Sequence, residues 1–221
     1  MITLPDFTKA FEYENDFYLS CDNSRLSKLL AHYELYKTIL NLPGAIVECG
    51  IFKGASFVRF AGFRELFGTS FSNKIIGFDI FDEFPETNFE DDQKYRDKFI
   101  KNAGKNSISE LQLLEVLNHK NVEKNIELIK GDICKTVPEY VKNNPHLKIA
   151  LLNLDVDIYE PAVTILEEFY PRICNGGILI LDDYGTFPGE TKAVDDYFRN
   201  KNVRICKFPF AMTPSYIVKE G

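Results

Sequence analysis

The chain alternates between short runs of apolar residues and longer amphipathic segments. The short runs are mostly aliphatic and end at glycine or charged residues, which is typical of buried strands. In the longer segments apolar residues recur every three or four positions, which is typical of helices that bury one side. The predicted strands are residues 45–49, 74–81, 126–132, 148–155, 176–184, 203–208 and 215–220.

Helices are predicted between most of these strands. They cover residues 24–41, 53–68, 136–144, 161–169 and 189–200. Strands that alternate with helices predict a mainly parallel sheet with helices on both faces. The last two strands are joined only by the short segment 209–214, which predicts an antiparallel hairpin. The predicted fold class is therefore α/β, with one Rossmann-like, mostly parallel, seven-stranded sheet that ends in a C-terminal antiparallel hairpin.

No repeat, low-complexity tract or flexible linker divides the 221 residues. This length is common for one α/β domain, so we expect a single domain over 1–221. Within it, residues 1–42 form an N-terminal helical segment. Residues 82–123 form a long polar, partly helical insertion after the second strand, which we expect to serve as a lid over a ligand.

Composition excludes several classes of protein. The formal charge of −7 and the lack of long basic runs argue against nucleic-acid binding. The five cysteines show no CxxC spacing, which favours reduced thiols over disulfides or structural zinc. The N-terminal residues do not resemble a signal peptide, and no apolar run is long enough to cross a membrane. We therefore expect a cytoplasmic protein without membrane or nucleic-acid partners.

The five predicted parallel strands all end at acidic residues. These are Glu48, Asp79, Asp132, Asp155 and Asp182. Because ligands of open α/β sheets bind beyond the carboxyl ends of the strands, this edge is the predicted functional site.

The turn after the first strand reads "VECGIFKGASF", residues 47–57. Gly50 and Gly54 allow a tight turn and a close approach of the backbone to a ligand, and Glu48 could accept a hydrogen bond from a ligand ammonium group. The turn is neither GxGxxG nor a Walker A motif, so dinucleotide and phosphate binding are weakly indicated. The alternative is that both glycines serve the turn alone. Ser56, in the same segment, is assigned with them to cofactor binding.

Two further strand ends suit a nucleoside. Asp79 could accept hydrogen bonds from both hydroxyls of a ribose, although a solvated strand end is the alternative. Asp132 could accept from an adenine amino group or cap the following helix; taken alone it favours the cap, and within the set it favours adenine.

Three aspartates at adjacent strand ends predict a metal site. Asp155 ends the fourth strand, and Asp182 and Asp183 end the fifth. Adjacent parallel strands lie about 4.8 Å apart, so these carboxylates would repel one another unless a cation binds. Ligands that are all oxygen favour Mg²⁺, with Mn²⁺ or Ca²⁺ as alternatives. An acidic rim neutralised by lysines is the weaker alternative, because no Lys or Arg lies within three positions of either cluster.

Other candidates are mostly structural. The histidines are predicted to lie at the surface, because none belongs to a nucleophile–base pattern; they are His32, His119 and His146. Asp157 is either a partner that orients Asp155 or a cap of the helix at Pro161. Aromatic residues within 81–99, together with Tyr159 and Tyr184, could line an acceptor pocket.

Several stretches in the correct order resemble the macrocin O-methyltransferase family of class I methyltransferases. They are "GAIVECGIFKGASF", "GFDIFDEFP" and "LDVDIYEP…YPRICNGGILILDDYG…AVDDYF". The resemblance runs from about residue 43 to residue 200. It implies that Asp155, Asp182 and Asp183 bind the metal and that Asp155 takes the proton of the acceptor hydroxyl. It also implies that S-adenosylmethionine lies among Glu48, Gly50, Asp79 and Asp132.

The function that follows is an S-adenosylmethionine- and metal-dependent O-methyltransferase acting on a sugar hydroxyl. The acceptor would be a nucleotide-linked deoxysugar, a glycosylated natural product or a polysaccharide precursor, and the resemblance implies a homo-oligomer. One alternative is a catechol or other vicinal phenol as acceptor, since a metal can bridge either kind of diol. Another is a non-catalytic binding protein that retains the fold.

Overall fold

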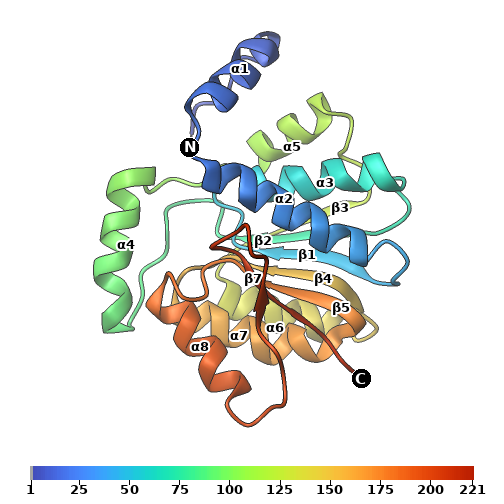
Figure 1. Cartoon of the computed structure of the whole chain (residues 1–221), viewed down its shortest axis with the longest axis vertical. Coiled ribbons are helices and arrows are strands. Elements are labelled where there is room, and N and C mark those ends of the chain that lie inside the picture. The colour runs from blue at the N-terminus through green and yellow to red at the C-terminus, as the bar shows by residue number, and fades with distance from the viewer. Residues whose placement is uncertain (1) are drawn as a thin grey trace.

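The computed structural model describes residues 2–221 and contains one seven-stranded sheet (Figure 1). The strands are β1 (Ala45–Cys49), β2 (Ile75–Asp79), β3 (Ile126–Lys130), β4 (Ile149–Leu154), β5 (Ile173–Leu181), β6 (Cys206–Lys207) and β7 (Ser215–Val218). Their order is β3-β2-β1-β4-β5-β7-β6. Strands β1 to β5 run parallel, and β7 pairs antiparallel with both β5 and β6. The predicted mixed sheet with its C-terminal hairpin is confirmed.

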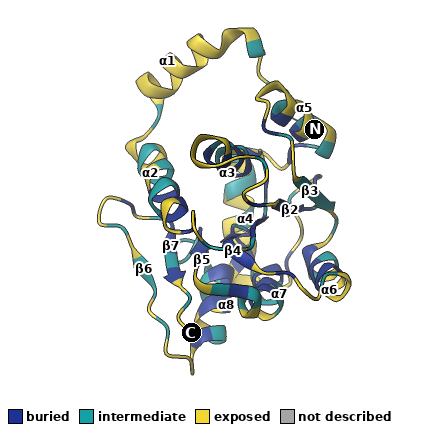
Figure 2. Cartoon of the chain, turned by 90° about the vertical axis from the view of Figure 1, so that its right-hand side faces the viewer, coloured by how far each residue is buried: buried dark blue, intermediate teal, exposed yellow. Residues whose placement is uncertain are grey.

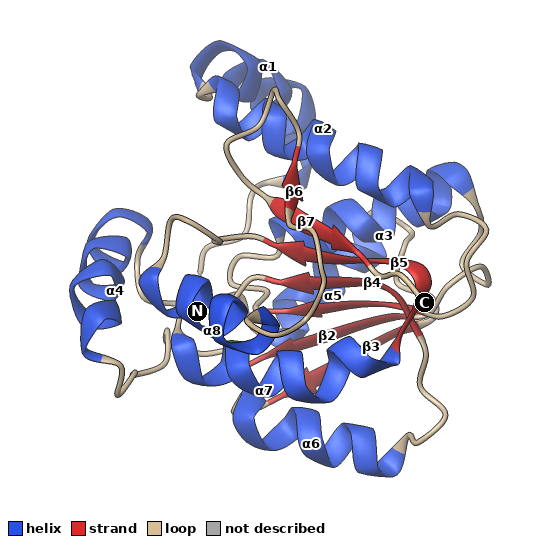
Figure 3. Cartoon of the chain, turned by 60° about the horizontal axis from the view of Figure 1, so that its bottom comes forward, coloured by secondary structure: helices blue, strands red, loops and turns tan. Residues whose placement is uncertain are grey.

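Helices cover both faces of this sheet. They are α1 (Ala10–Ser20), α2 (Asn23–Thr38), α3 (Ala55–Phe67), α4 (Glu90–Ala103), α5 (Glu110–His119), α6 (Ile133–Asn143), α7 (Tyr159–Phe169) and α8 (Pro188–Phe198). Short 3₁₀ turns lie at Phe7–Lys9 and Tyr170–Arg172. In Figures 1 and 3, α2, α3 and α5 lie on one face, and α6, α7 and α8 lie on the other. No helix within residues 2–221 combines the length and apolar character that crossing a membrane requires.

The alternation of side chains along the strands divides the core into two layers. On β1, Ala45, Val47 and Cys49 pack toward α6 and α7, whereas Ile46, between the first two, packs toward α2 and α3. Successive residues of a strand point to opposite faces, so a central strand that is apolar throughout supplies both layers. The uninterrupted aliphatic runs of the sequence therefore correspond to strands that are buried on both faces.

The predicted lid region is built differently in its two halves. Helix α4 lies beside α8 at the edge of the molecule and buries only one of its residues, Asp92. The second half belongs to the core: Ile108, Leu113, Leu117 and Val122 are buried against α3 and the sheet. Only the first half of the insertion, up to about residue 103, has the exposure that a lid needs.

Helix α1 projects away from the rest of the protein (Figure 2). None of its residues is buried, and it exposes Phe11, Tyr18 and Leu19. Helix α2 then returns to the sheet, where it buries Ala31 and Leu35. The helical segment predicted over residues 1–42 is mainly helical in its described part.

A buried arginine holds the amino ends of two parallel strands in place. Arg64 of α3 is fully buried, and its guanidinium donates to the backbone carbonyls of Val122 and Lys124, at 3.1 and 2.6 Å. It also donates to the carbonyls of Asn73 and Asn125, both at 3.3 Å. These hydrogen bonds join the segments that lead into β2 and β3.

The turn after β1 brings the backbone of two strands together. Gly50 has a φ of +88°, and its N–H donates to the carbonyl of Phe78 at 2.9 Å. A Cβ at this position would lie 1.7 Å from the carbonyl oxygen of Asp155. Only glycine satisfies both the left-handed conformation and this close approach.

Gly50→Ala is therefore expected to lower the free energy of unfolding by about 3 kcal/mol or more, from backbone strain and overpacking together. Chemical denaturation followed by circular dichroism measures the change. Gly62→Ala is the matched control, because Gly62 lies inside α3 with nothing within 4 Å of the added Cβ. It should stabilise the helix by about 0.5–1 kcal/mol. Equal stability of the two variants would contradict the role assigned to Gly50.

Candidate active site

A cavity of about 970 Å³ lies beyond the carboxyl ends of the parallel strands. Its wall includes Gly50, Asp79, Asp132, Asp155 and Asp182, one residue from the end of each of the five strands or from the turn that follows it. Helices α2 and α3 supply Arg25, Lys28, Ser56 and Arg59 to the same wall. The predicted edge of the sheet therefore carries the larger of the two pockets described here.

The three aspartates predicted to bind a metal lie together. Asp155, Asp182 and Asp183 each offer a carboxylate oxygen, and these oxygens lie within 4.8 Å of one another. Asp182 is nearly buried, and its Oδ1 has no hydrogen-bond partner. Three neighbouring carboxylates, which offer only oxygen donors, form a donor set that fits a hard divalent cation such as Mg²⁺.

A lysine that the sequence does not place nearby contacts this cluster. The Nζ of Lys28, on α2, forms an ion pair with Asp182 and lies 4.0 Å from Oδ2 of Asp155. Burial lowers the pKa of Lys28, but the carboxylates of Asp182 and Asp155 raise it more, so the lysine stays charged. Neutralisation by lysine, which the sequence made the weaker alternative, therefore occurs in part, because α2 brings Lys28 in from a distant part of the chain.

The carboxyl groups differ in their affinity for protons. Burial and the charge of Asp182 raise the pKa of Asp155 well above its usual value. Burial also raises the pKa of Asp182, but Lys28 and His32 lower it more, so this carboxylate is ionised. A cluster with one strongly ionised member next to one of raised pKa is typical of functional sites.

Asp157 pairs with Asp183 and does not cap α7. The N-cap of α7 is Ile158, so the capping alternative for Asp157 is wrong. Asp157 has a φ of +62°, and burial together with the neighbouring Asp183 raises the pKa of its carboxyl group well above the usual value. The raised pKa favours a protonated Asp157, which relieves the repulsion from Asp183.

Asp79 braces the glycine turn. Its Oδ2 accepts from the backbone N–H groups of Ile51 and Phe52, at 2.7 and 3.0 Å. Its Oδ1 accepts from the N–H of Phe81 at 2.5 Å. The hydroxyl of Ser107 lies 3.1 Å from the same oxygen, but its one proton is closer to the carbonyl of Phe52, at 2.6 Å. Asp79 lines the cavity, and three backbone N–H groups already donate to its carboxylate, which leaves about one acceptor site for a ribose hydroxyl.

The other predicted cofactor contacts divide into two groups. Gly50, Ser56 and Asp132 line the cavity, and Asp132 also caps α6 by accepting from the N–H of Cys134 at 3.0 Å. Glu48 and Gly54 are not among the lining residues. Glu48 is fully buried beneath Ser56, whose hydroxyl donates to its Oε1 at 2.5 Å. Burial raises the pKa of Glu48 to about 8.

The basic residues on one side of the cavity were not predicted from the sequence. Arg25, Lys28 and His32 recur along α2 at intervals of three and four residues, which is the signal that could have indicated one polar face. His32 was expected at the surface, but it is fully buried and stacks on Phe60 with ring centroids 5.0 Å apart. Burial lowers its pKa.

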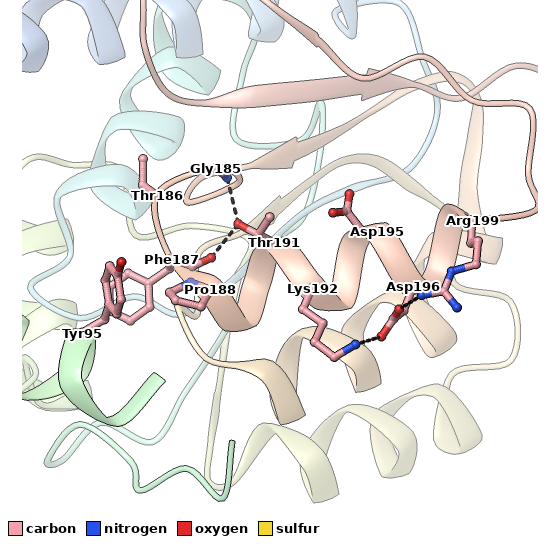
Figure 4. A pocket seen from close by; sticks show the side chains of 10 residues that line it. All are labelled: Tyr95, Gly185, Thr186, Phe187, Pro188, Thr191, Lys192, Asp195, Asp196 and Arg199. Carbon is pink, nitrogen blue, oxygen red and sulfur yellow. Dashed lines mark hydrogen bonds and ion pairs between the residues drawn. The ribbon is translucent and has the colours of Figure 1, made fainter. Parts of the chain in front are cut away.

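A smaller hollow of about 460 Å³ lies along α8 (Figure 4). Its polar groups are bonded to one another: Lys192 pairs with Asp196 at 2.7 Å, and Thr191 accepts from the N–H of Gly185 at 2.9 Å. Tyr95 of α4 lies against Phe187 at its edge. The charged side chains of this hollow are already paired with one another. It therefore lacks the closely spaced carboxylates found in the main cavity.

The sheet order, the antiparallel strand β7 between β5 and β6, and the cavity at the strand tips define a class I methyltransferase fold. The sequence profile of the macrocin O-methyltransferase (TylF) family matches residues 21–208, so the chain belongs to this family. The resemblance predicted from the sequence is confirmed.

Relatives with known names are O-methyltransferases. The chain is 26% identical to demethyldecarbamoylnovobiocin O-methyltransferase of Streptomyces niveus over 161 residues, which cover 71% of this chain and 59% of the relative. It is also 26% identical to a rhamnosyl-tetracenomycin C 4'-O-methyltransferase of Streptomyces olivaceus, covering 71% and 58%. The chain thus spans about three fifths of the length of these relatives.

A solved structure is similar over nearly the whole chain. It is the calicheamicin methyltransferase CalS11, at 29% identity and a TM-score of 0.78, with 94% of this chain and 84% of that chain covered. A second structure of CalS11, described as a TDP-rhamnose 3'-O-methyltransferase, gives 26% identity and a TM-score of 0.70, with 95% and 86% covered.

Glu48 is expected to make stability depend on pH. Its pKa of about 8 in the folded protein exceeds the usual 4.5, so the folded state holds a proton that the unfolded chain releases. The stabilisation that this proton gives to the folded state is fully present below about pH 4.5 and is lost as pH rises through 8. Over this range the free energy of unfolding falls by up to about 1.4 kcal/mol per pH unit. Glu48→Gln should therefore raise the melting temperature by several degrees at pH 8 and little at pH 5. Glu34→Gln, an exposed change on α2, should have the same small effect at both values.

Lys28→Met removes the ammonium group from the acidic cluster and keeps most of the apolar stem. We expect the metal-free protein to lose about 1–3 kcal/mol of stability, because the carboxylates lose a partly buried partner. Added Mg²⁺ should raise the melting temperature of Lys28→Met more than that of the unmodified protein. Lys37→Met, on the exposed side of the same helix, is the control. A Lys28→Met protein with ordinary stability and no response to Mg²⁺ would argue against a cation site.

Proposed function

We propose that this chain is an S-adenosylmethionine-dependent O-methyltransferase that acts on a sugar hydroxyl and uses a divalent cation held by Asp155, Asp182 and Asp183. The observation that carries the proposal is the position of these carboxylates. Their oxygens lie within 4.8 Å of one another in the wall of the cavity that also contains the glycine turn after β1. Membership of the macrocin O-methyltransferase family supports the reaction type.

The donor would lie at the β1–β3 end of the cavity. Gly50 gives it access to the backbone, Asp79 keeps the turn in place, and Asp132 presents a carboxylate at the start of α6. Ser56 lines the same wall, with Glu48 directly behind it. Methyl transfer from a sulfonium needs alignment of donor and acceptor more than chemical activation of the donor, so a rigid turn is the main requirement.

Asp155 is the proposed base. A sugar hydroxyl is a weak acid, and a divalent cation at this site would supply Lewis-acid polarisation of that oxygen. Asp155 lies in the cavity wall and is only partly exposed, and its raised pKa makes it a stronger base than an ordinary aspartate. Asp182 remains ionised because Lys28 and His32 lie beside it, so the two aspartates have different roles.

The names of the relatives favour a sugar-containing small molecule as the acceptor. CalS11 is described as acting on TDP-rhamnose, and the relative of Streptomyces olivaceus is named for a rhamnosyl group. Phe84 and Phe99 of the predicted acceptor region line the cavity, and an apolar surface of this kind suits the ring face and methyl group of a deoxysugar.

The test is a methyl-transfer screen read by mass spectrometry. Acceptors should include nucleotide-linked deoxysugars, glycosylated natural products and catechols, each with Mg²⁺, Mn²⁺, Ca²⁺ or EDTA. We expect transfer to a sugar hydroxyl that EDTA abolishes. Transfer to catechols alone would show that the acceptor is a vicinal phenol and not a sugar. A protein that does not bind S-adenosylmethionine in calorimetry would be a non-catalytic protein.

Asp182→Asn is expected to reduce methyl transfer by at least about 100-fold, because it removes a charged metal ligand while keeping the shape of the side chain. Binding of S-adenosylhomocysteine, measured by calorimetry, should change little. Asp91→Asn, an exposed change on α4, is the control and should retain activity. Loss of donor binding as the main defect of Asp182→Asn would contradict its assignment to the metal.

A further inference from the structure

A line of polar groups leads from the partly buried Arg59 through the buried His32 to Asp182 of the acidic cluster. Arg59 of α3 approaches His32 of α2, with 3.1 Å between Nη1 and Nδ1. On the other side of the ring, Nε2 of His32 lies 3.8 Å from Oδ1 of Asp182. These three side chains form a line from α3 through α2 to the end of β5.

The arginine determines which ring nitrogen carries the proton. A guanidinium can only donate hydrogen bonds, so Nδ1 of His32 must accept and carries no hydrogen. The proton of the neutral imidazole is then on Nε2, the nitrogen that faces Asp182. The ring has little freedom to turn, because it is fully buried and stacked on Phe60 with an interplanar angle of 12°.

The two atoms that face each other between His32 and Asp182 have no other hydrogen-bond partner. Nε2 of His32 and Oδ1 of Asp182 are buried and form no hydrogen bond, although they face each other. Their separation of 3.8 Å is about 0.8 Å longer than an ordinary hydrogen bond. Because an unpaired buried donor and acceptor each cost free energy, a small rotation of the Asp182 carboxylate that joins them is favoured.

We propose that His32 is a positioning residue for the metal site: its Nε2–H holds Oδ1 of Asp182, and Arg59 keeps the proton on Nε2. The inference rests on the proposed function, since it concerns the same acidic cluster. Oδ2 of Asp182, which pairs with Lys28 in the metal-free protein, would then be the oxygen offered to the cation in place of the lysine. A ligating carboxylate held in this way loses less freedom when the ion binds, and removal of such partners typically weakens metal affinity about 10- to 100-fold.

The first readout is metal affinity, measured as Mn²⁺ binding by electron paramagnetic resonance without donor or acceptor. His32→Phe keeps an aromatic ring on Phe60 but lacks the N–H, and we expect at least about 10-fold weaker binding. His32→Gln provides an amide N–H and should restore affinity to within about threefold of the unmodified protein. His146→Gln changes an exposed histidine elsewhere and should have no effect. Binding of S-adenosylhomocysteine should be unchanged in all three variants.

The second readout is the tautomer, observed by ¹⁵N nuclear magnetic resonance of the imidazole nitrogens. The chain has three histidines, so substituting each in turn assigns the signals. We expect His32 as the Nε2–H form, a mixture of tautomers in Arg59→Met, and the Nε2–H form again in Arg59→Lys, which keeps a donor.

Several outcomes would overturn this proposal. They are an Nδ1–H tautomer in the unmodified protein, equal Mn²⁺ affinity in His32→Phe, and a lack of Mn²⁺ binding altogether. The proposed function fails separately: a protein with the expected tautomer and affinities that methylates no acceptor would retain the role of His32 but not the enzyme activity. Conversely, methyl transfer with Mn²⁺ affinity insensitive to His32 would leave the function in place and reject the positioning role.

Discussion

Repulsion among carboxyl groups at the ends of β4 and β5 is the constraint on which the rest of the site depends. The parallel sheet brings the ends of these strands to one edge, and the cluster is then stabilised in two ways. Lys28 supplies positive charge to Asp182 and Asp155. Asp157 and Asp183 lie side by side, and the pKa of each is raised by burial and by neighbouring charge. The cluster is therefore neutralised both by the ammonium group of Lys28 and by protons that carboxyl groups of raised pKa can bind.

The two ends of the cavity have different electrostatic characters. Near β1 and β2, three backbone N–H groups hold the carboxylate of Asp79, so it contributes shape and rigidity. Near β4 and β5, Asp182 has one oxygen on a lysine and the other without a partner. This difference agrees with a division of labour in which one end holds a donor and the other end carries the chemistry.

The sequence predicted the features that follow from local patterns. Strands, their alternation with helices and the hairpin could be predicted because periodicity and segment length are local properties. The three aspartates could be predicted to meet because parallel strands place their ends at one edge. Lys28 and His32 could not, because their contact with Asp182 depends on how α2 packs across the sheet, and 154 positions separate Lys28 from Asp182. Asp157 stayed open for a similar reason: its neighbour, Asp183, lies on another segment.

The two ends of the parallel strands hold their charged side chains in different surroundings. At the edge that leads into β2 and β3, the guanidinium of Arg64 is covalently part of the chain and is surrounded by backbone carbonyls. Arg64 is fully buried, so ions in the solvent do not reach its guanidinium. The carboxyl ends of the strands instead face a cavity, where acidic side chains are in reach of solvent protons. A change in solvent composition is therefore expected to affect the carboxyl ends of the strands more than the amino ends.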